Sequence, residues 1–332
     1  MNELHVGTAT AEPGKKGYGF LEVGETNDGA PIRIPVGVIL GKTPGPTLWL
    51  QNGAHGMEYV GMGAIQRILQ GVDPAEVSGG VVCIPMVNIL AFRAGTRGAP
   101  QDGLDWNRSY PGNPLERAMH VFAHTEIAVH KFFSELVRVS NYLVDCHAGG
   151  WYTTMSPYAQ YFASENETED KSHAMAEASG MTLIWRTSAL EAIDKAPNSL
   201  KIWAYKEGIA GITLELGGQG RLDEDHVERT HRSLLNIMKQ LGILPGKPAS
   251  FGDQYLVKRG HWLRPEAGGV LWCKAKPLDR VKKGQVIHII TDLLGRERQR
   301  LIAPVDGVVV GIRTLGIVNS GEYCGNIGEL EE

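Results

Sequence analysis

The 332-residue sequence predicts an α/β fold with a mixed sheet flanked by helices, followed by a smaller all-β domain. Short apolar and β-branched runs alternate with helical patterns through residues 1–245, which is typical of crossover units in a parallel or mixed sheet. After LPGKPAS, residues 244–250, the pattern changes to short strands separated by glycine and proline turns. We therefore expect two domains, residues 1–245 and 246–332, and a chain of this length can bury a substantial core.

The elements of the first domain follow from periodicity and turn residues. Residues 1–30 are short alternating pieces broken by glycine and proline, so we expect β entry strands there. Runs rich in Val, Ile and Leu predict further strands at 32–40, 47–51, 81–88, 142–147 and 211–220. Amphipathic spacing predicts helices at 60–70, 117–139, 171–179, 199–208 and 224–241.

Composition excludes several classes of protein. The formal net charge is -4, from 33 Lys and Arg against 37 Asp and Glu, whereas nucleic-acid-binding domains are normally basic. No apolar run approaches the roughly 20 residues of a membrane helix, and the N-terminus has no apolar signal core. The four cysteines form no C-x-x-C pair. We expect a soluble, cytoplasmic protein without nucleic-acid or membrane partners, and the sequence leaves homo-oligomerisation open.

The stretch LWLQNGAHGMEYVGM, residues 48–62, reads as strand, tight loop and helix. Its loop presents His55 and Glu58, and open α/β sheets place their ligands at the carboxyl ends of strands. An imidazole and a carboxylate three residues apart can converge on one metal ion. The alternative is that His55 only caps or packs in the loop. His147, which ends the strand in NYLVDCHAGG, favours the metal site, because two His, one Glu and an open position form a common catalytic zinc arrangement.

The strand GITLELGGQG, residues 211–220, carries a candidate acid. Its three apolar side chains share one face, so Thr213 and Glu215 share the other. Glu215 is then either a solvent-facing strand residue or an acid near the metal. The two glycines that follow it, and the need of a metal site for a base, favour the second interpretation.

The segment between residues 92 and 112 is a long polar loop rich in glycine. Such loops inside a compact domain are usually functional or disordered. Arg93, Arg97 and Arg108 make a functional loop the better hypothesis. The alternative for these arginines is an ion pair that only holds the loop in place.

Four motifs together resemble a known family. GAHGMEYVG is similar to the H-G-x-E zinc motif of the succinylglutamate desuccinylase and aspartoacylase family, whose fold is similar to that of zinc carboxypeptidases. DWNRSYPG resembles the D-x-N-R-x-x-P-G substrate loop of that family, VDCHAG its third-ligand strand and ITLELGG its catalytic glutamate strand. The motifs occur in the family's order between about residues 47 and 218, and their joint occurrence is specific. The long loop looks most like the branch that includes N-acetyl-diaminobutyrate deacetylases.

The resemblance implies one Zn²⁺ per chain, bound by His55, Glu58 and His147. Zinc can lower the pKa of a coordinated water to about 7, which supplies a nucleophile near neutral pH. Glu215 would then serve as general acid and base, taking the water proton and returning it to the leaving amine.

The resemblance also implies roles for the long loop. Asn107 and Arg108 would hold a substrate carboxylate, for which the planar fork of a guanidinium is suited. Arg97, in AGTRG, is the best match to the arginine that polarises the scissile carbonyl. Arg93 remains a competitor, because the stretch between Arg97 and Asn107 is longer than in the aspartoacylase branch.

The C-terminal segments LDRVKKGQVIHI and LIAPVDGVVV resemble a biotinyl or lipoyl carrier fold. The hairpin between Thr291 and Leu301 has no lysine where a carrier would attach its cofactor. We therefore expect a structural domain that, by the family's example, narrows access to the site.

The leading functional hypothesis is a zinc-dependent hydrolase that removes a small acyl group from the nitrogen of an amino acid or similar small acid. A zinc carboxypeptidase acting on peptides would share the metal and the glutamate. A non-catalytic small-ligand-binding member of the fold is a third hypothesis, and the complete ligand set argues against it. Iron oxygenases also use two His and one carboxylate, but their first His and acid are usually separated by one residue, not two.

Overall fold

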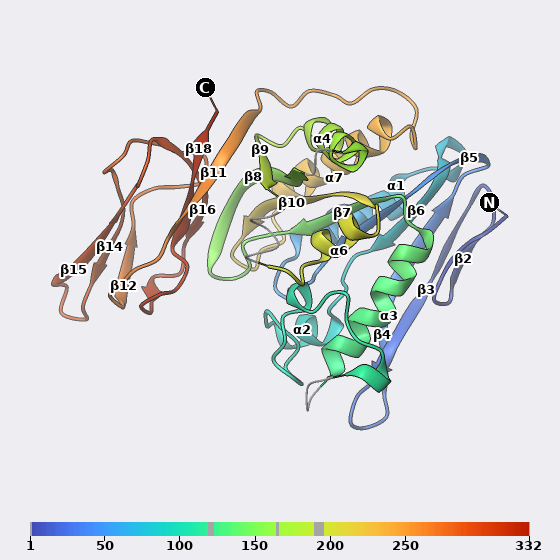
Figure 1. Cartoon of the computed structure of the whole chain (residues 1–332), viewed down its shortest axis with the longest axis horizontal. Coiled ribbons are helices and arrows are strands. Elements are labelled where there is room, and N and C mark those ends of the chain that lie inside the picture. The colour runs from blue at the N-terminus through green and yellow to red at the C-terminus, as the bar shows by residue number, and fades with distance from the viewer. Residues whose placement is uncertain (1, 119–122, 164–165, 189–195, 332) are drawn as a thin grey trace.

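The computed structural model describes residues 2–118, 123–163, 166–188 and 196–331. Figure 1 shows a broad sheet with helices on both faces and, at one end, strands from the C-terminal part of the chain. The predicted α/β class, with a mixed sheet and a smaller all-β part, is confirmed. None of the helices in the described ranges is long and apolar enough to cross a membrane.

The helices alternate with strands in the first part of the chain. The α-helices are α1 (Val60–Gly71), α2 (Ile89–Ala94), α3 (His124–Val139), α4 (Glu167–Ala178), α6 (Leu200–Lys206) and α7 (Glu224–Gln240). Short 3₁₀ helices are η1 (Pro74–Glu76), η2 (Trp106–Arg108) and η3 (Leu115–Arg117).

The strands continue to the end of the described chain. They are β1 (Leu4–Val6), β2 (Ala9–Ala11), β3 (Lys15–Glu25), β4 (Pro31–Leu40), β5 (Thr43–Asn52), β6 (Ser78–Ile84), β7 (Tyr142–His147), β8 (Thr153–Ala163) and β9 (Leu183–Ser188). The later strands are β10 (Ala210–Gly218), β11 (Tyr255–Leu263), β12 (Gly269–Cys273), β13 (Arg280–Val281), β14 (Val286–Thr291), β15 (Glu297–Ile302), β16 (Gly307–Arg313), β17 (Ile317–Val318) and β18 (Gly325–Leu330).

Twelve strands form one mixed sheet, in the spatial order β13-β16-β18-β11-β9-β8-β10-β7-β5-β6-β4-β3. At its centre β6, β5, β7 and β10 are neighbours and run parallel to one another. Parallel neighbours have their carboxyl ends at the same edge of a sheet. The loop after β5 and the ends of β7 and β10 therefore lie together, although they are far apart in the sequence.

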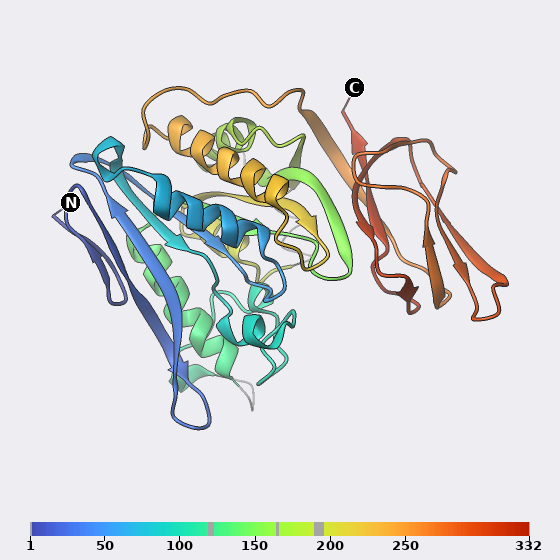
Figure 2. The same cartoon turned by 180° about the vertical axis from the view of Figure 1, so that it is seen from behind.

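Alternation along β5 divides the core between the two faces of this sheet. Leu48 and Leu50 belong to the core on the face of α1, α4 and α7. Trp49 points to the opposite face and packs against Phe132 of α3, with ring centroids 5.3 Å apart. Figures 1 and 2 show these helices on the two sides of the sheet. Full burial of one such side chain contributes about 1.5–3 kcal/mol, so the strands that carry the site are held from both faces.

Two predicted helices begin at different residues in the structure. The helix expected at 117–139 is α3, which begins at His124; residues 119–122 lie outside the described ranges, and Ala118 has an extended backbone (ψ 126°) that ends η3. The helix expected at 171–179 is α4, which begins earlier because the Asn166 side chain accepts hydrogen bonds from the Thr168 and Glu169 amides. An N-cap of this kind satisfies amides that have no partner inside the helix.

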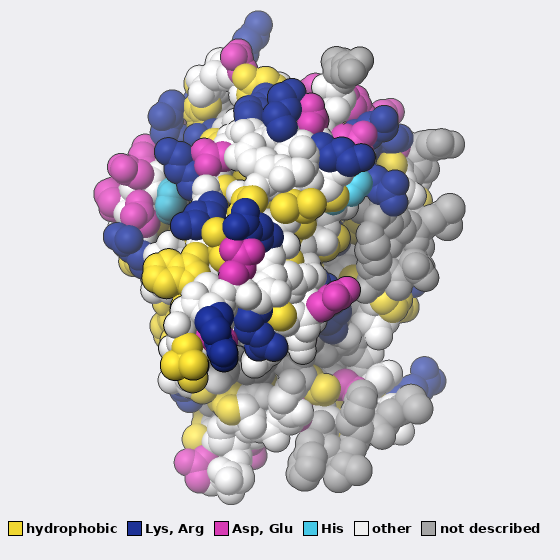
Figure 3. All heavy atoms as spheres, turned by 90° about the vertical axis from the view of Figure 1, so that its left-hand side faces the viewer, with side chains coloured by type: hydrophobic (Ala, Val, Ile, Leu, Met, Phe, Trp, Pro, Cys, Tyr) yellow, Lys and Arg dark blue, Asp and Glu magenta, His cyan; other side chains and the backbone are white. Residues whose placement is uncertain are grey.

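The C-terminal strands both extend the large sheet and form a second one. β11 pairs with β9, β16 pairs with β8, and the strands β12, β14, β15 and β17 form a separate four-stranded antiparallel sheet. Its outer side faces the viewer in Figure 3, where Lys and Arg side chains are interspersed with acidic and apolar ones. We call residues 255–331 the C-terminal module. Because β16 is hydrogen-bonded to β8, this module is fixed beside the carboxyl end of β10.

Candidate metal centre

The loop after β5 turns sharply so that two of its side chains face one point. Gly53 has φ 84°, and a Cβ there would lie 2.2 Å from the Met86 sulfur, so only glycine fits the turn. The side chain of Asn52 donates a hydrogen bond to the Glu58 carbonyl (2.9 Å), which closes the loop onto the start of α1. The local sequence thus fixes the direction in which His55 and Glu58 point.

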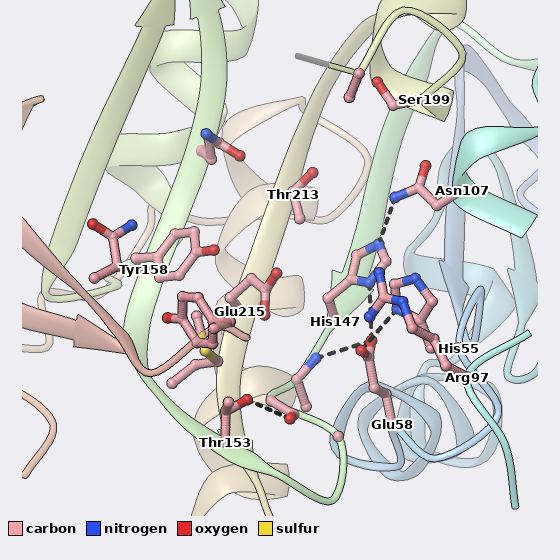
Figure 4. A pocket seen from close by; sticks show the side chains of 18 of the residues that line it. His55, Glu58, Arg97, Asn107, His147, Thr153, Tyr158, Ser199, Thr213 and Glu215 are labelled. Atoms are coloured by element: carbon pink, nitrogen blue, oxygen red, sulfur yellow. Dashed lines mark hydrogen bonds and ion pairs between the residues drawn. The ribbon is translucent and has the colours of Figure 1, made fainter. Parts of the chain in front are cut away.

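His55, Glu58 and His147 meet in one cluster, as Figure 4 shows. The Nδ1 atom of His55 lies 2.7 Å from Glu58 Oε1, and Nδ1 of His147 lies 2.9 Å from Glu58 Oε2. The three side chains are buried, with exposed fractions of 4–5%. Their ligand atoms all lie within 4.8 Å of one another. The structure therefore brings together the three residues that the sequence predicts as metal ligands.

Each histidine also contacts an aspartate carboxylate through its other ring nitrogen, Nε2. Nε2 of His55 lies 3.2 Å from Asp105 Oδ1, and Nε2 of His147 lies 2.9 Å from Asp145 Oδ2. A histidine that binds a metal usually donates its other ring N–H to such an acceptor, which fixes the tautomer and the ring orientation. The arrangement assigns the proton of a neutral imidazole to Nε2 and leaves Nδ1 free to coordinate. Sequence reasoning missed both aspartates as partners of the ligands.

The charges of this cluster fit a bound cation. Burial alone lowers the pKa of His147, but the charges of Asp145 and Glu58 outweigh it and raise the pKa well above the usual value. Burial alone raises the pKa of Glu58, but the two histidines outweigh it and lower the pKa. Buried carboxylates require a compensating positive charge. Two imidazole nitrogens and a carboxylate are also the donor set that zinc takes in catalytic sites, so the residues present fit this metal.

Glu215 lies on β10, beside the cluster. Its Cα is paired with that of His147 in the parallel register, and Figure 4 shows its carboxyl group facing across the cavity toward the ligands. Burial raises the pKa of Glu215 to about 7; the His147 charge opposes this and the Glu58 charge adds to it. A cation bound at the ligands would lower this pKa. A carboxyl group that titrates near neutral pH is suited to exchange protons with a reactant.

Asn107 and Arg108 reach the same cavity from η2. The Asn107 side-chain nitrogen lies 3.4 Å from His147 Nε2, and its oxygen accepts a hydrogen bond from the Leu200 amide (3.0 Å) at the start of α6. Arg108 lines the cavity and donates to the Asn107 carbonyl (2.8 Å). The structure thus places both residues of the predicted carboxylate site within the cavity, with Asn107 tied to α6.

The structure distinguishes the two candidate arginines, Arg97 and Arg93, by their positions relative to the cavity. Arg97 lines the cavity, and its guanidinium lies 3.0 Å from the second oxygen of Asp105, the carboxylate that also holds His55. Arg93 is exposed and is not among the residues that line the cavity. Because one carboxylate bridges Arg97 and His55, the guanidinium is fixed beside the ligand cluster.

The cavity has a volume of about 870 Å³ and is closed partly by the C-terminal module. Lining residues from this module include Trp262, Arg264, Arg313, Tyr323 and Asn326. The Tyr323 hydroxyl and the Asn326 side-chain oxygen are buried without a hydrogen-bond partner in the described part of the chain. Sequence reasoning expected narrowed access here, but it named none of these residues.

An α/β fold with a His–Glu–His cluster at the carboxyl ends of parallel strands, facing a cavity, is typical of metal-dependent enzymes. Residues 44–241 match the model of the succinylglutamate desuccinylase/aspartoacylase catalytic domain. The chain therefore belongs to this family, whose members are metal-dependent deacylases.

Individual relatives agree with this assignment. The chain is 29% identical to the N-alpha-acetyl-L-2,4-diaminobutyric acid deacetylase of Halomonas elongata, over 95% of this chain and 92% of that protein. The product-bound ectoine utilization protein EutE (DoeB) from Ruegeria pomeroyi has a similar structure, with a TM-score of 0.84, 24% identity, and coverage of 95% of this chain and 94% of that chain. A succinylglutamate desuccinylase/aspartoacylase from Rhodobacter sphaeroides gives a TM-score of 0.83 at 24% identity, covering 96% and 95%. At these identities the two structures establish the fold.

Proposed function

We propose that the protein is a zinc-dependent deacylase that hydrolyses the amide bond of a small N-acyl amino acid. One observation carries the proposal. Two imidazole Nδ1 atoms and a carboxylate converge on one point, and Glu215 faces that point across a cavity large enough for such a substrate. The family and the deacetylase relative support the same reaction class.

In this proposal His55, Glu58 and His147 hold one Zn²⁺ per chain. Bound there, zinc would supply Lewis acidity and a water of lowered pKa, about 7 in comparable sites. Glu215 accepts a proton as the amide carbon is attacked and delivers it to the leaving amine nitrogen. Burial raises its pKa to about 7, and a cation at the ligands would lower that pKa, so the carboxylate form that accepts a proton would be present at neutral pH.

Arg97 and the Asn107–Arg108 pair act on the substrate. Negative charge develops on the carbonyl oxygen during attack, and a fixed guanidinium beside the ligands would stabilise it by about 3–4 kcal/mol, the scale of one lost oxyanion donor. The contact with Asp105 (3.0 Å) keeps Arg97 in that position. Asn107 and Arg108 bind the substrate carboxylate, for which a planar guanidinium is suited.

The N-alpha-acetyl group of the relative's substrate makes an N-acetyl amino acid the first compound to assay. The four cysteines are free thiols, which supports action in a reducing, cytoplasmic compartment.

The test is a panel of N-acetyl, N-succinyl and N-formyl amino acids, including N-alpha-acetyl-L-2,4-diaminobutyrate, incubated with zinc-loaded protein. We expect release of free amine from at least one N-acyl amino acid and about one zinc per chain. Release of C-terminal residues from unblocked peptides, with no action on the panel, would identify a carboxypeptidase instead. Zinc well below one per chain, together with no turnover, would favour a binding protein.

A further inference from the structure

Lys201, on α6, is a lysine inside the cavity that the proposed chemistry does not use. Its ammonium nitrogen donates a hydrogen bond to the Gln160 side-chain oxygen and lies 5.3 Å from the centre of the Phe162 ring. The Gln160 amide nitrogen in turn donates to the Thr187 hydroxyl (2.6 Å). All four residues line the cavity. These two hydrogen bonds, from Gln160 of β8 to Thr187 of β9 and from Lys201 to Gln160, fix the position of the ammonium.

The ammonium of Lys201 has no carboxylate within ion-pair distance in the described part of the chain. An ammonium has three donors, and Gln160 takes one of them. Burial lowers the pKa of Lys201 to about 8, an effect that the charges of Glu215 and Asp145 reduce. An anionic group that enters the cavity would therefore stabilise the charge of this ammonium.

The register of the sheet places Gln160, the hydrogen-bond partner of Lys201, two residue positions along from Glu215. In the β8–β10 pairing Tyr158 lies opposite Glu215, and Gln160 lies opposite Thr213. Two residues of a strand span about 7 Å. An amide group beside Glu215 and a carboxylate beside Lys201 are therefore within the reach of one compact N-acyl amino acid.

Arg108, of η2, lines the same cavity as Lys201. The Leu200 amide, next to Lys201, donates to the Asn107 side chain, so the start of α6 and the Asn107–Arg108 segment are joined. The charge of Arg108 is close enough to act on Lys201. Two cations from different elements thus line one cavity and are close enough for their charges to interact.

We propose that Lys201 is a specificity-determining residue that binds the substrate carboxylate together with Arg108. This inference rests on the proposed function, because it assigns the carboxylate of the N-acyl amino acid to a particular pair of side chains. Gln160 acts as a positioning residue that aims the ammonium. A lysine that served only to pack against Phe162 would not distinguish a carboxylate from a neutral amide.

The experiment compares the binding of N-alpha-acetyl-L-2,4-diaminobutyrate with that of its carboxamide. Binding is measured by calorimetry at pH 6.5, where Lys201 is charged, on zinc-loaded protein that carries Glu215→Gln so that hydrolysis of either probe is slowed. We expect the carboxylate to bind about 10- to 100-fold more tightly than the carboxamide, the range for hydrogen bonds to charged groups. Adding Lys201→Met should reduce this preference by about tenfold, and Lys201→Arg should restore part of it.

Lys206→Met is the matched control, because it removes the same charge from the same helix but outside the cavity; Lys206 packs over Trp203 (3.9 Å to the ring centre). It should leave the preference unchanged. Zinc content and thermal unfolding show whether each variant is folded, and Lys201→Arg covers the case in which Lys201→Met is not. An undiminished preference in folded Lys201→Met, an equal loss in Lys206→Met, or no preference in the parent protein would overturn the proposal.

This measurement and the test of the proposed function can fail independently. If the native protein turns over no N-acyl amino acid but the carboxylate preference depends on Lys201, the deacylase proposal fails and the anion site stands. If turnover is found but the carboxylate preference does not depend on Lys201, only the inference about Lys201 fails.

Discussion

Two walls of one cavity satisfy their polar groups in different ways. The ligand wall consists of His55, Glu58 and His147 with the two aspartates behind them, Asp105 and Asp145, and four contacts of 2.7–3.2 Å join these five side chains. The substrate wall consists of Tyr158, Lys201, Glu215, Tyr323 and Asn326. Among the residues that the structure describes, the buried polar atoms of Tyr323 and Asn326 have no partner there and Lys201 has no carboxylate partner. The ligand wall is organised before anything binds, whereas the substrate wall is completed by what enters the cavity.

The largest effect on zinc content and turnover should follow from removing a metal ligand from the ligand wall. His147→Ala removes one of three ligands and leaves Glu58 and Asp145 without their shared partner. We expect zinc content far below one per chain and loss of nearly all turnover, measured by metal analysis and amine release. Stoichiometric, tightly held zinc in this variant would show that the wall is not a metal site.

A change on the substrate wall should separate chemistry from metal binding. Glu215→Gln keeps the shape of the side chain but removes its proton exchange, so turnover should fall by about 10²- to 10⁴-fold. Zinc content should remain that of the native protein, because Glu215 is not a ligand in our proposal. Equal metal loss in Glu215→Gln and His147→Ala would contradict the division between the two walls.

Asp145→Asn tests how strictly the ligand wall is organised. Asp145 accepts from both His147 Nε2 (2.9 Å) and the Gln51 amide (3.0 Å), and Gln51 is itself held by the Trp49 indole (3.1 Å). An asparagine must therefore present its NH₂ group to one of two donors. We expect zinc affinity to fall about 10- to 100-fold in chelator competition. Asp306→Asn, at an exposed site, is the control, and an equal loss there would show a non-specific effect.

The smallest predicted effect is a pH dependence of the substrate wall. The groups that act on Lys201 are Glu215 of β10, Asp145 of β7, Arg108 of η2 and the neutral Gln160 of β8. Burial lowers its pKa to about 8, so its charge is present below pH 8 and is lost above it. The KM of a carboxylate substrate should rise by about tenfold between pH 7 and 9, the value of one charged contact. The KM of the carboxamide should change much less over the same pH range. Equal changes in the two KM values would show that the charge of Lys201 is not the cause.

The ligand wall was largely predictable from the sequence because its signals are local. His55 and Glu58 are three residues apart, and His147 ends an apolar run. Asp145 carried a signal that was overlooked: it lies two residues before His147 on a strand, so both side chains point to the same face. Asp105 opens the quoted DWNRSYPG motif, but only the folded loop shows that it reaches His55.

The substrate wall was harder to predict because it depends on pairing between distant strands. Lys201 appears in the sequence as an ordinary residue of a short helix. Tyr323 and Asn326 reach the cavity only because β16 pairs with β8 and β18 pairs with β16. No local pattern near residue 323 indicates this register. The same pairing also joins the predicted all-β domain to the large sheet, which composition alone could not show.

The antiparallel contact between β8 and β16 has a consequence for engineering. A fragment that ends at the linker near residue 250 would leave the outer edges of β8 and β9 without their strand partners, and such edges promote aggregation. Grafting a C-terminal segment from another family member would exchange part of the cavity lining while leaving the metal ligands untouched. Chimeras of this kind offer a route to new acyl or amine preference without redesign of the reactive groups.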